Sequence, residues 1–154
     1  MKLIESRPEA LVFVLGRREF ALLLTALHEF PPKRPKPPAI TSHGAPPNDS
    51  AQAMLEESLD EHRREHAAAL RAFLESGEHI AVAGTAIHFT LPRESVEWLL
   101  QMLNDVRVGS WELLGCPNPD EMKVTDETVM PCMLMETCAV FQMAVLAALE
   151  KSPS

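Results

Sequence analysis

Two histidines near the middle of the chain have the spacing of a metal-binding pair. The segment His62-Arg63-Arg64-Glu65-His66 matches the pattern HxxEH of inverzincin proteases, in which histidines one helical turn apart bind zinc and a glutamate activates water. At about 100° per residue, both histidines fall within the apolar stripe of a helix. Such inward-facing imidazoles can chelate a metal. They can equally be structural side chains that hydrogen-bond a carbonyl at the edge of the core, and we favour this interpretation.

A third metal ligand can be proposed from an internal repeat with an offset of 76 residues, described below. The offset places Cys138 at the position equivalent to His62, so His62, His66 and Cys138 converge if the two repeats face each other. Two imidazoles and a thiolate suit zinc. The sequence therefore leaves open a metal-binding protein, or a metal-dependent hydrolase, that uses these side chains.

The last apolar segment of the chain is rich in sulfur. Thioether and thiolate groups are soft ligands that suit Cu(I), and several fall close together: Met130, Cys132, Met133, Met135, Cys138 and Met143. Adaptable core packing is the more usual role of methionine, and we favour it here. The three cysteines form no CxxC motif, so we expect reduced thiols and a cytoplasmic protein.

A second group of polar residues lies on one predicted helix. Asn104, Arg107 and Trp111 follow the spacing i, i+3, i+7 and share a helix face, with Asp105 beside them. Asparagine and arginine at such positions commonly brace the backbone of an adjacent loop, which we favour. The same side chains would also suit a recognition site for a carboxylate or a peptide carbonyl.

The segment around these residues carries a family resemblance. Its pattern W-x-x-x-x-L-N-D-x-R, followed by a helix that closes on Leu114-Gly115, resembles the signature of a bacterial, mainly actinobacterial, domain of unknown function. The order of elements is similar, although the long proline-rich loop, the HRREH segment and the sulfur-rich last helix depart from the family. The resemblance implies a gene neighbourhood beside a Clp protease adaptor, and hence a connection with proteostasis. It implies no activity.

The chain repeats part of its own pattern. Residues 10–27 align without a gap on residues 86–103, with seven of 18 positions identical, and the matched order is strand, chain-breaker, arginine, helix. The offset is almost half of the 154 residues. We therefore predict two duplicated halves, 1–76 and 77–154, within one domain, and a proline-rich loop over residues 31–47.

Each half is predicted to contain a strand, a helix, a loop and a second helix, in that order. The alternating apolar residues of 11–15 and 86–91 predict two strands. Caps and breakers place helices at about 17–30, 50–76, 92–115 and 126–151. The predicted fold is therefore α+β and mostly α, with a short two-stranded antiparallel sheet packed on about four helices around a pseudo-twofold axis.

The repeat also pairs two arginines. Arg17 and Arg93 each follow a strand and begin a helix, where an anion is favoured. Together they could form anion contacts in a small-molecule site at the internal twofold axis. We prefer the alternative that they are ordinary solvated residues of a first helical turn.

Composition narrows the class of function. A net charge of −8 and the absence of tyrosine argue against nucleic acid and anionic membranes as partners, and no Gly-rich phosphate loop is present. The final helix carries one formal charge, Glu136, between residues 128 and 149, so it is buried or lies in an interface. We favour a non-enzymatic adaptor or regulatory module that acts as a homodimer and has no cofactor. We expect it to bind a protein partner. The alternative is the zinc site described above.

Overall fold

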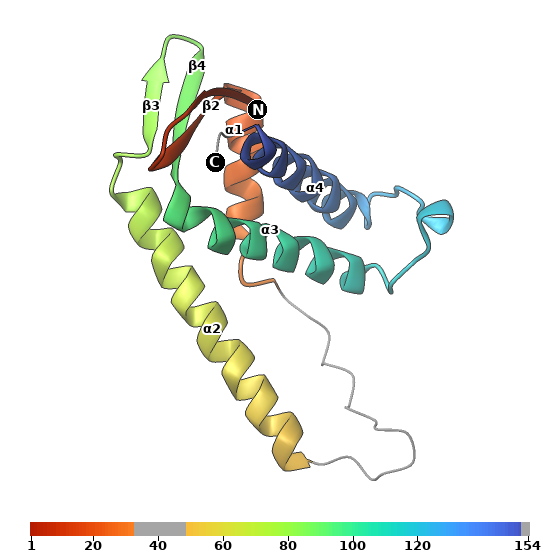
Figure 1. Cartoon of the computed structure of the whole chain (residues 1–154). Helices are drawn as coiled ribbons and strands as arrows, with labels where there is room; N and C mark the ends of the chain where they lie inside the picture. Colours follow the sequence, from red (N-terminus) through yellow and green to blue (C-terminus); the bar gives the residue numbers. More distant parts are fainter. Residues whose placement is uncertain (33–48, 152–154) are drawn as a thin grey trace.

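The computed structural model describes residues 1–32 and 49–151. The elements follow the order β1 (Lys2–Ser6), β2 (Ala10–Gly16), α1 (Arg17–His28), α2 (Asp49–Glu75), β3 (Ile80–Ala83), β4 (Ala86–Pro92), α3 (Arg93–Leu113), a 3-10 turn (Pro119–Glu121) and α4 (Val129–Glu150). The fold is α+β and mostly helical, as the sequence predicts (Figure 1). Most of the proline-rich loop predicted at 31–47 lies outside the described residues.

The centre of the sheet is the predicted antiparallel pair. β2 lies against β4 in the register Phe13↔Phe89, which joins the two phenylalanines that the 76-residue offset aligns. The prediction of only two strands is wrong, because the sheet has four, in the order β1-β2-β4-β3. The extra strands are short edges of tight hairpins, and Gly84 supplies the positive φ of 62° that the second hairpin turn requires.

One face of the sheet meets the helices. Leu11, Phe13 and Leu15 of β2 and Phe89 and Leu91 of β4 alternate inward and are fully buried. Buried residues of three helices complete this core: Leu23, Ala26 and Leu27 of α1, Leu99, Met102, Leu103 and Val106 of α3, and Cys138, Phe141, Val145 and Ala148 of α4. Figure 1 shows α4 returning alongside α3, with α1 behind them. A core in a domain of this size needs no metal or disulfide to be stable.

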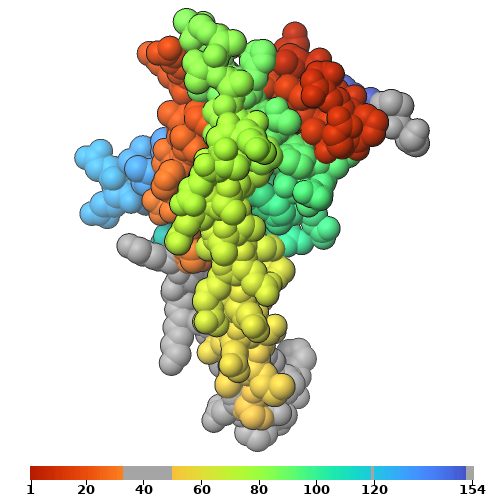
Figure 2. Space-filling view, turned by 90° about the vertical axis from the view of Figure 1, so that its left-hand side faces the viewer, coloured from red at the N-terminus to blue at the C-terminus, as the bar shows by residue number. Residues whose placement is uncertain are grey.

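The helix α2 is placed differently from the others. Its C-terminal half packs on the body through Leu70 and Phe73, whereas every residue from 53 to 61 is exposed. Figure 2 shows this N-terminal half standing clear below the body of the molecule. The helix ends before Gly77, whose φ of 66° is the left-handed value of a helix stop, as predicted.

The two halves therefore agree only in part. In both, a hairpin leads directly into a helix, and a second helix follows. The second helices differ, because α4 packs along α3 whereas α2 has no comparable contact with α1. The predicted equivalence of the two complete halves does not extend to α2 and α4.

The helix α4 is apolar along its whole length. It begins at Val129, with Pro131 in its first turn, where proline is tolerated. By length and composition alone its 22 residues could cross a bilayer. One such helix is weak evidence for a membrane span, because the core helix of a soluble protein has the same composition.

We expect Phe73→Ala to loosen α2 from the body. The Phe73 ring stacks on His79 at 4.1 Å between centroids and meets Phe89 and Trp98 edge-on at 5.8 and 5.5 Å. Losing it should cost about 3 kcal/mol of unfolding free energy in urea and speed proteolysis within α2. Leu59→Ala, at an exposed position of the same helix, is the control and should stay within about 0.5 kcal/mol of wild type. Equal effects of the two substitutions would contradict this placement of α2.

Candidate functional site

The two histidines of the HRREH segment lie side by side on α2, as their spacing predicts. Their ring centroids are 4.0 Å apart with an interplanar angle of 54°. The His62 ring nitrogen Nε2 lies 3.4 Å from Gln101 Oε1 on α3, to which its N–H can donate. The His66 ring faces Phe30, two residues after the end of α1, with 6.3 Å between centroids. The pair thus forms part of the contact between α2 and the body.

Charged side chains continue this contact. The Arg63 guanidinium lies 3.7 Å from Asp105 of α3 and 3.3 Å from Asp60 of its own helix. The pKa of His66 is lowered, chiefly because partial burial disfavours the charged imidazolium and also because His62 would repel it. Asp105 and Glu65 act in the opposite direction. His66 is therefore held toward its neutral form.

The structure does not bring Cys138 to the two histidines. Cys138 is fully buried in the core, where desolvation raises the pKa of its thiol to about 12 and the Arg107 charge lowers it only in part. Asp105 faces α2 and Arg107 faces Cys138, and residues two positions apart point to different sides of a helix. The thiol and the histidines therefore lie on different sides of α3. Among the described residues, no three His, Cys, Asp or Glu side chains are arranged to hold a metal ion.

The pairing of Arg17 and Arg93 as anion contacts, which the sequence left open as the less favoured possibility, is not found. Because β2 and β4 are antiparallel, the two arginines follow opposite ends of the strand pair. Each braces the hairpin of the other half: Arg17 donates to the Gly84 carbonyl oxygen at 3.2 Å, and Arg93 donates to the Arg7 carbonyl oxygen at 3.0 Å and to Ser6 Oγ at 2.9 Å. Their role in the fold is structural.

Two residues of the predicted polar helix face, Arg107 and Trp111, border a pocket between α3 and α4. Trp111 braces the following loop, because its indole N–H donates to the Pro117 carbonyl oxygen at 3.1 Å. Asn104 and Arg107 are exposed. Asp105 turns away to Arg63 and does not belong to this face. The loop is thus braced by Trp111, whereas the bracing predicted for Asn104 and Arg107 is not found among the described residues.

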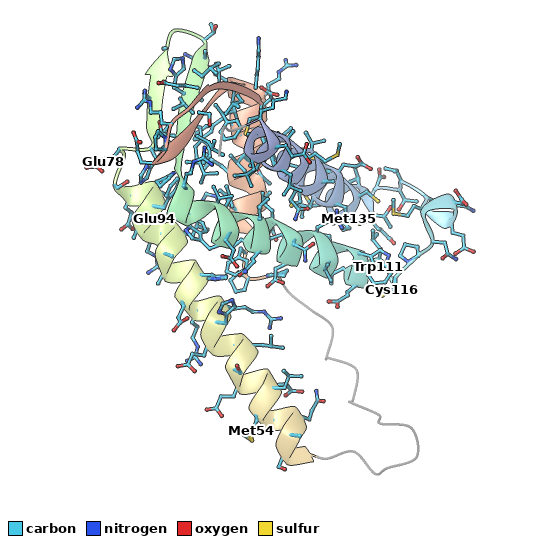
Figure 3. The ribbon with its side chains drawn as sticks, in the orientation of Figure 1. Met54, Glu78, Glu94, Trp111, Cys116 and Met135 are labelled. Carbon is cyan, nitrogen blue, oxygen red and sulfur yellow. The ribbon has the colours of Figure 1, made fainter. Side chains whose placement is uncertain are left out.

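The pocket has a volume of about 390 Å³ and two walls. Its lining residues come from α3 (Arg107, Val108, Trp111) and from α4 (Met135, Glu136, Ala139). Figure 3 shows Trp111 and Met135 at the same end of the two helices, near the connecting segment. The α4 wall was not predicted from the sequence, because its residues meet Arg107 only once α4 packs along α3.

A second surface runs along the outer side of α4. The side chains of Val140, Met143 and Leu146 are 56%, 70% and 48% exposed, and Ala147 lies exposed among them. We call these four residues the outer strip. They share one side of the helix, opposite the buried Cys138, Phe141 and Val145. The sequence predicts that this helix is buried or lies in an interface. The structure shows which of its sides is buried and which is exposed.

Comparison of the chain with protein-family models, with curated proteins and with solved structures gives no match. The resemblance carried by Trp98–Gly115 stays an expectation from the sequence, and the function is argued from the surfaces themselves.

We expect acid to weaken the contact between α2 and the body through His66. A histidine whose pKa is lower in the folded state binds its proton more readily in the unfolded state. Its contribution to the stability of the fold is therefore fully present above the usual pKa of 6.5. This contribution is lost as the pH falls toward the pKa of the folded state. The melting temperature of wild type should therefore fall more between pH 7.5 and 5.5 than that of His66→Gln. His28→Gln, an exposed histidine of α1, is the control. An identical pH dependence in wild type and His66→Gln would contradict the assignment.

Proposed function

We propose that the protein is a non-enzymatic cytoplasmic binding module that acts as a homodimer, and that the outer strip of α4 is the surface at which two copies meet. The observation that carries this proposal is the apolar character of α4 on both sides. Its inner side is buried in the core, and its outer side exposes Val140, Met143 and Leu146 to water. An adaptor or regulatory role would use the remaining surfaces of such a dimer.

Burial of the outer strip supplies a driving force for association. Fully burying a valine, leucine or methionine side chain contributes roughly 1.5–3 kcal/mol, so the strip offers several kcal/mol from each copy. The strip, from Val140 to Ala147, extends for roughly 11 Å along the helix axis. A strip of this length, presented by both copies, can form the centre of a twofold interface.

The charge distribution directs association to this surface. The chain carries a net charge of −8, so two copies repel each other over most of their area. The outer strip has no formal charge, and Glu136 and Glu150 lie toward its ends. Added salt should therefore favour the dimer, because it screens the repulsion and leaves the apolar contact in place.

An antiparallel pairing of the two α4 helices fits the sequence of the strip. Residues 133, 136, 140, 143, 147 and 150 alternate steps of three and four, the spacing of a coiled-coil seam. When Val140 is set against Met143 of a second copy, Glu136 faces Ala147 and Met133 faces Glu150. No two carboxylates then meet. A parallel pairing would set Glu136 against its own counterpart.

We also propose that residues 10–27 and 86–103 are copies of one strand–helix unit. Two observations support a twofold relation between these units. The register joins Phe13 to Phe89, which are 76 positions apart, and Arg17 and Arg93 each reach the hairpin of the opposite half.

We expect Met143→Glu to convert a dimer into a monomer. A carboxylate at this position would have to be buried unpaired in the interface, which costs more than the apolar contact contributes. Multi-angle light scattering should show the mass of two chains for wild type and one for the variant, at about 50 µM. Met54→Glu is a matched control, because Met54 is 72% exposed on α2 while Met143 is 70% exposed on α4; it should remain a dimer.

Three results would overturn this assignment. Wild type with the mass of one chain would contradict the dimer. Loss of the dimer in Met54→Glu and not in Met143→Glu would place the interface on α2. Co-sedimentation of wild type, but not Met143→Glu, with phosphatidylcholine vesicles, without self-association, would make the strip a membrane contact.

The metal-binding alternative has a separate test. The 4.0 Å contact between the imidazoles of His62 and His66 is the observation in its favour. It predicts that untagged protein holds one equivalent of a transition metal and that His62→Ala loses it. If metal is absent and His62→Ala changes only stability, by about 1 kcal/mol or less, the histidines are structural.

A further inference from the structure

We propose that the pocket between α3 and α4 binds a small ligand that joins an apolar body to a carboxylate, with Arg107 as the residue that receives the carboxylate. This inference deepens the proposed binding function by naming a ligand class for one site. Four observations support it. They are the apolar composition of the pocket walls, the fixed position of the Trp111 ring, the absence of an ion pair at Arg107 among the described residues, and the position of Glu136 on the α4 wall.

The walls of the pocket suit an apolar body. Val108 and Trp111 of α3 face Met135 and Ala139 of α4 across it. An indole and a thioether give large, polarisable surfaces, and methionine adapts its shape to what it contacts. The hydrogen bond from the Trp111 N–H to the Pro117 carbonyl oxygen fixes the ring, so little ordering of this wall is needed when a ligand enters.

Arg107 gives the pocket its preference for an anion. The guanidinium lines the pocket and is exposed, and it forms no ion pair or hydrogen bond with any residue of the part of the chain that is described. Its charge acts on Cys138, which places it toward the groove between the two helices. A planar guanidinium in this state can donate two parallel hydrogen bonds to one carboxylate.

Glu136 gives the ligand a direction. It lines the pocket from α4 and is also exposed, and no ion pair joins it to Arg107. Its negative charge repels a carboxylate, so the anionic end of the ligand must lie toward α3 and the apolar body toward Met135 and Ala139. Removing the charge of Glu136 should therefore strengthen binding of an anion, whereas removing the charge of Arg107 should weaken it.

The size of the pocket limits the ligand. About 390 Å³ is near the lower end of the range for small-molecule sites. It accommodates a ligand with about a dozen non-hydrogen atoms, for which dissociation constants on the order of 1 mM are expected from an open site. An aryl or short acyl carboxylate has this size and this chemistry.

The test compares 4-phenylbutyrate with its neutral amide, 4-phenylbutyramide. Each is titrated into ¹⁵N-labelled protein while the indole N–H resonance of Trp111 is followed, with Trp98→Phe used to assign it. We expect a saturable shift with both, and a dissociation constant roughly fivefold lower for the acid. Arg107→Met should abolish this difference, and Arg107→Lys should restore part of it. Glu136→Gln should tighten binding of the acid by about twofold.

Arg71→Met is the control, because it removes one positive charge from an exposed position of α2 and should keep the full preference for the acid. Equal affinities for acid and amide in wild type would overturn the proposal, as would a preference that survives Arg107→Met or an absent shift at about 20 mM. Weaker binding of the acid in Glu136→Gln would overturn the proposed orientation. The molar mass is measured separately. A dimer that binds acid and amide equally well contradicts only the proposed ligand site. A monomer that prefers the acid contradicts only the proposed dimer.

Discussion

The packing of α4 along α3 determines where the other surfaces of the molecule face. Cys138, Phe141 and Val145 of α4 close the core over the sheet and over α3, and Gln142 donates to the Leu100 carbonyl oxygen at 3.2 Å across the same contact. Because the helix is apolar on all sides, burying one side leaves the other in water. The same contact sets Met135 and Ala139 opposite Trp111 and so creates the pocket. One interaction thus produces the core, the proposed dimer surface and the proposed ligand site.

The contact between α2 and the body has a different physical character. It is made by two buried residues, Leu70 and Phe73, and by polar pairs in which Arg63 meets Asp105 and His62 meets Gln101. Exposed polar pairs contribute little to stability, so Leu70 and Phe73 carry most of the attachment. His66 lies within this contact and is held toward its neutral form. The attachment of α2 therefore rests on fewer buried residues than that of α4, and we expect it to weaken in acid.

Local patterns in the sequence predict those elements whose structure depends mainly on their own residues. The alternation of Leu11, Phe13 and Leu15 gives β2, and the glycine after residue 76 ends α2 at the expected place. The edge strands β1 and β3 were missed because short strands with one exposed side leave a weak pattern. The proposed convergence of His62, His66 and Cys138 failed because it required α2 and α4 to be placed symmetrically, and tertiary packing placed them differently. The helix face of Arg107 was visible in the sequence, whereas its opposite wall depended on which side α4 presents.

The claim that two copies meet along α4 has a direct test in isotope-filtered nuclear Overhauser spectra of a sample that mixes ¹³C-methyl-labelled and unlabelled chains. The account predicts intermolecular contacts between the Met143 methyl group of one copy and Val140 of the other, as the antiparallel register requires. Intermolecular contacts that involve Met54 instead, or none at a concentration of about 0.5 mM, would contradict it.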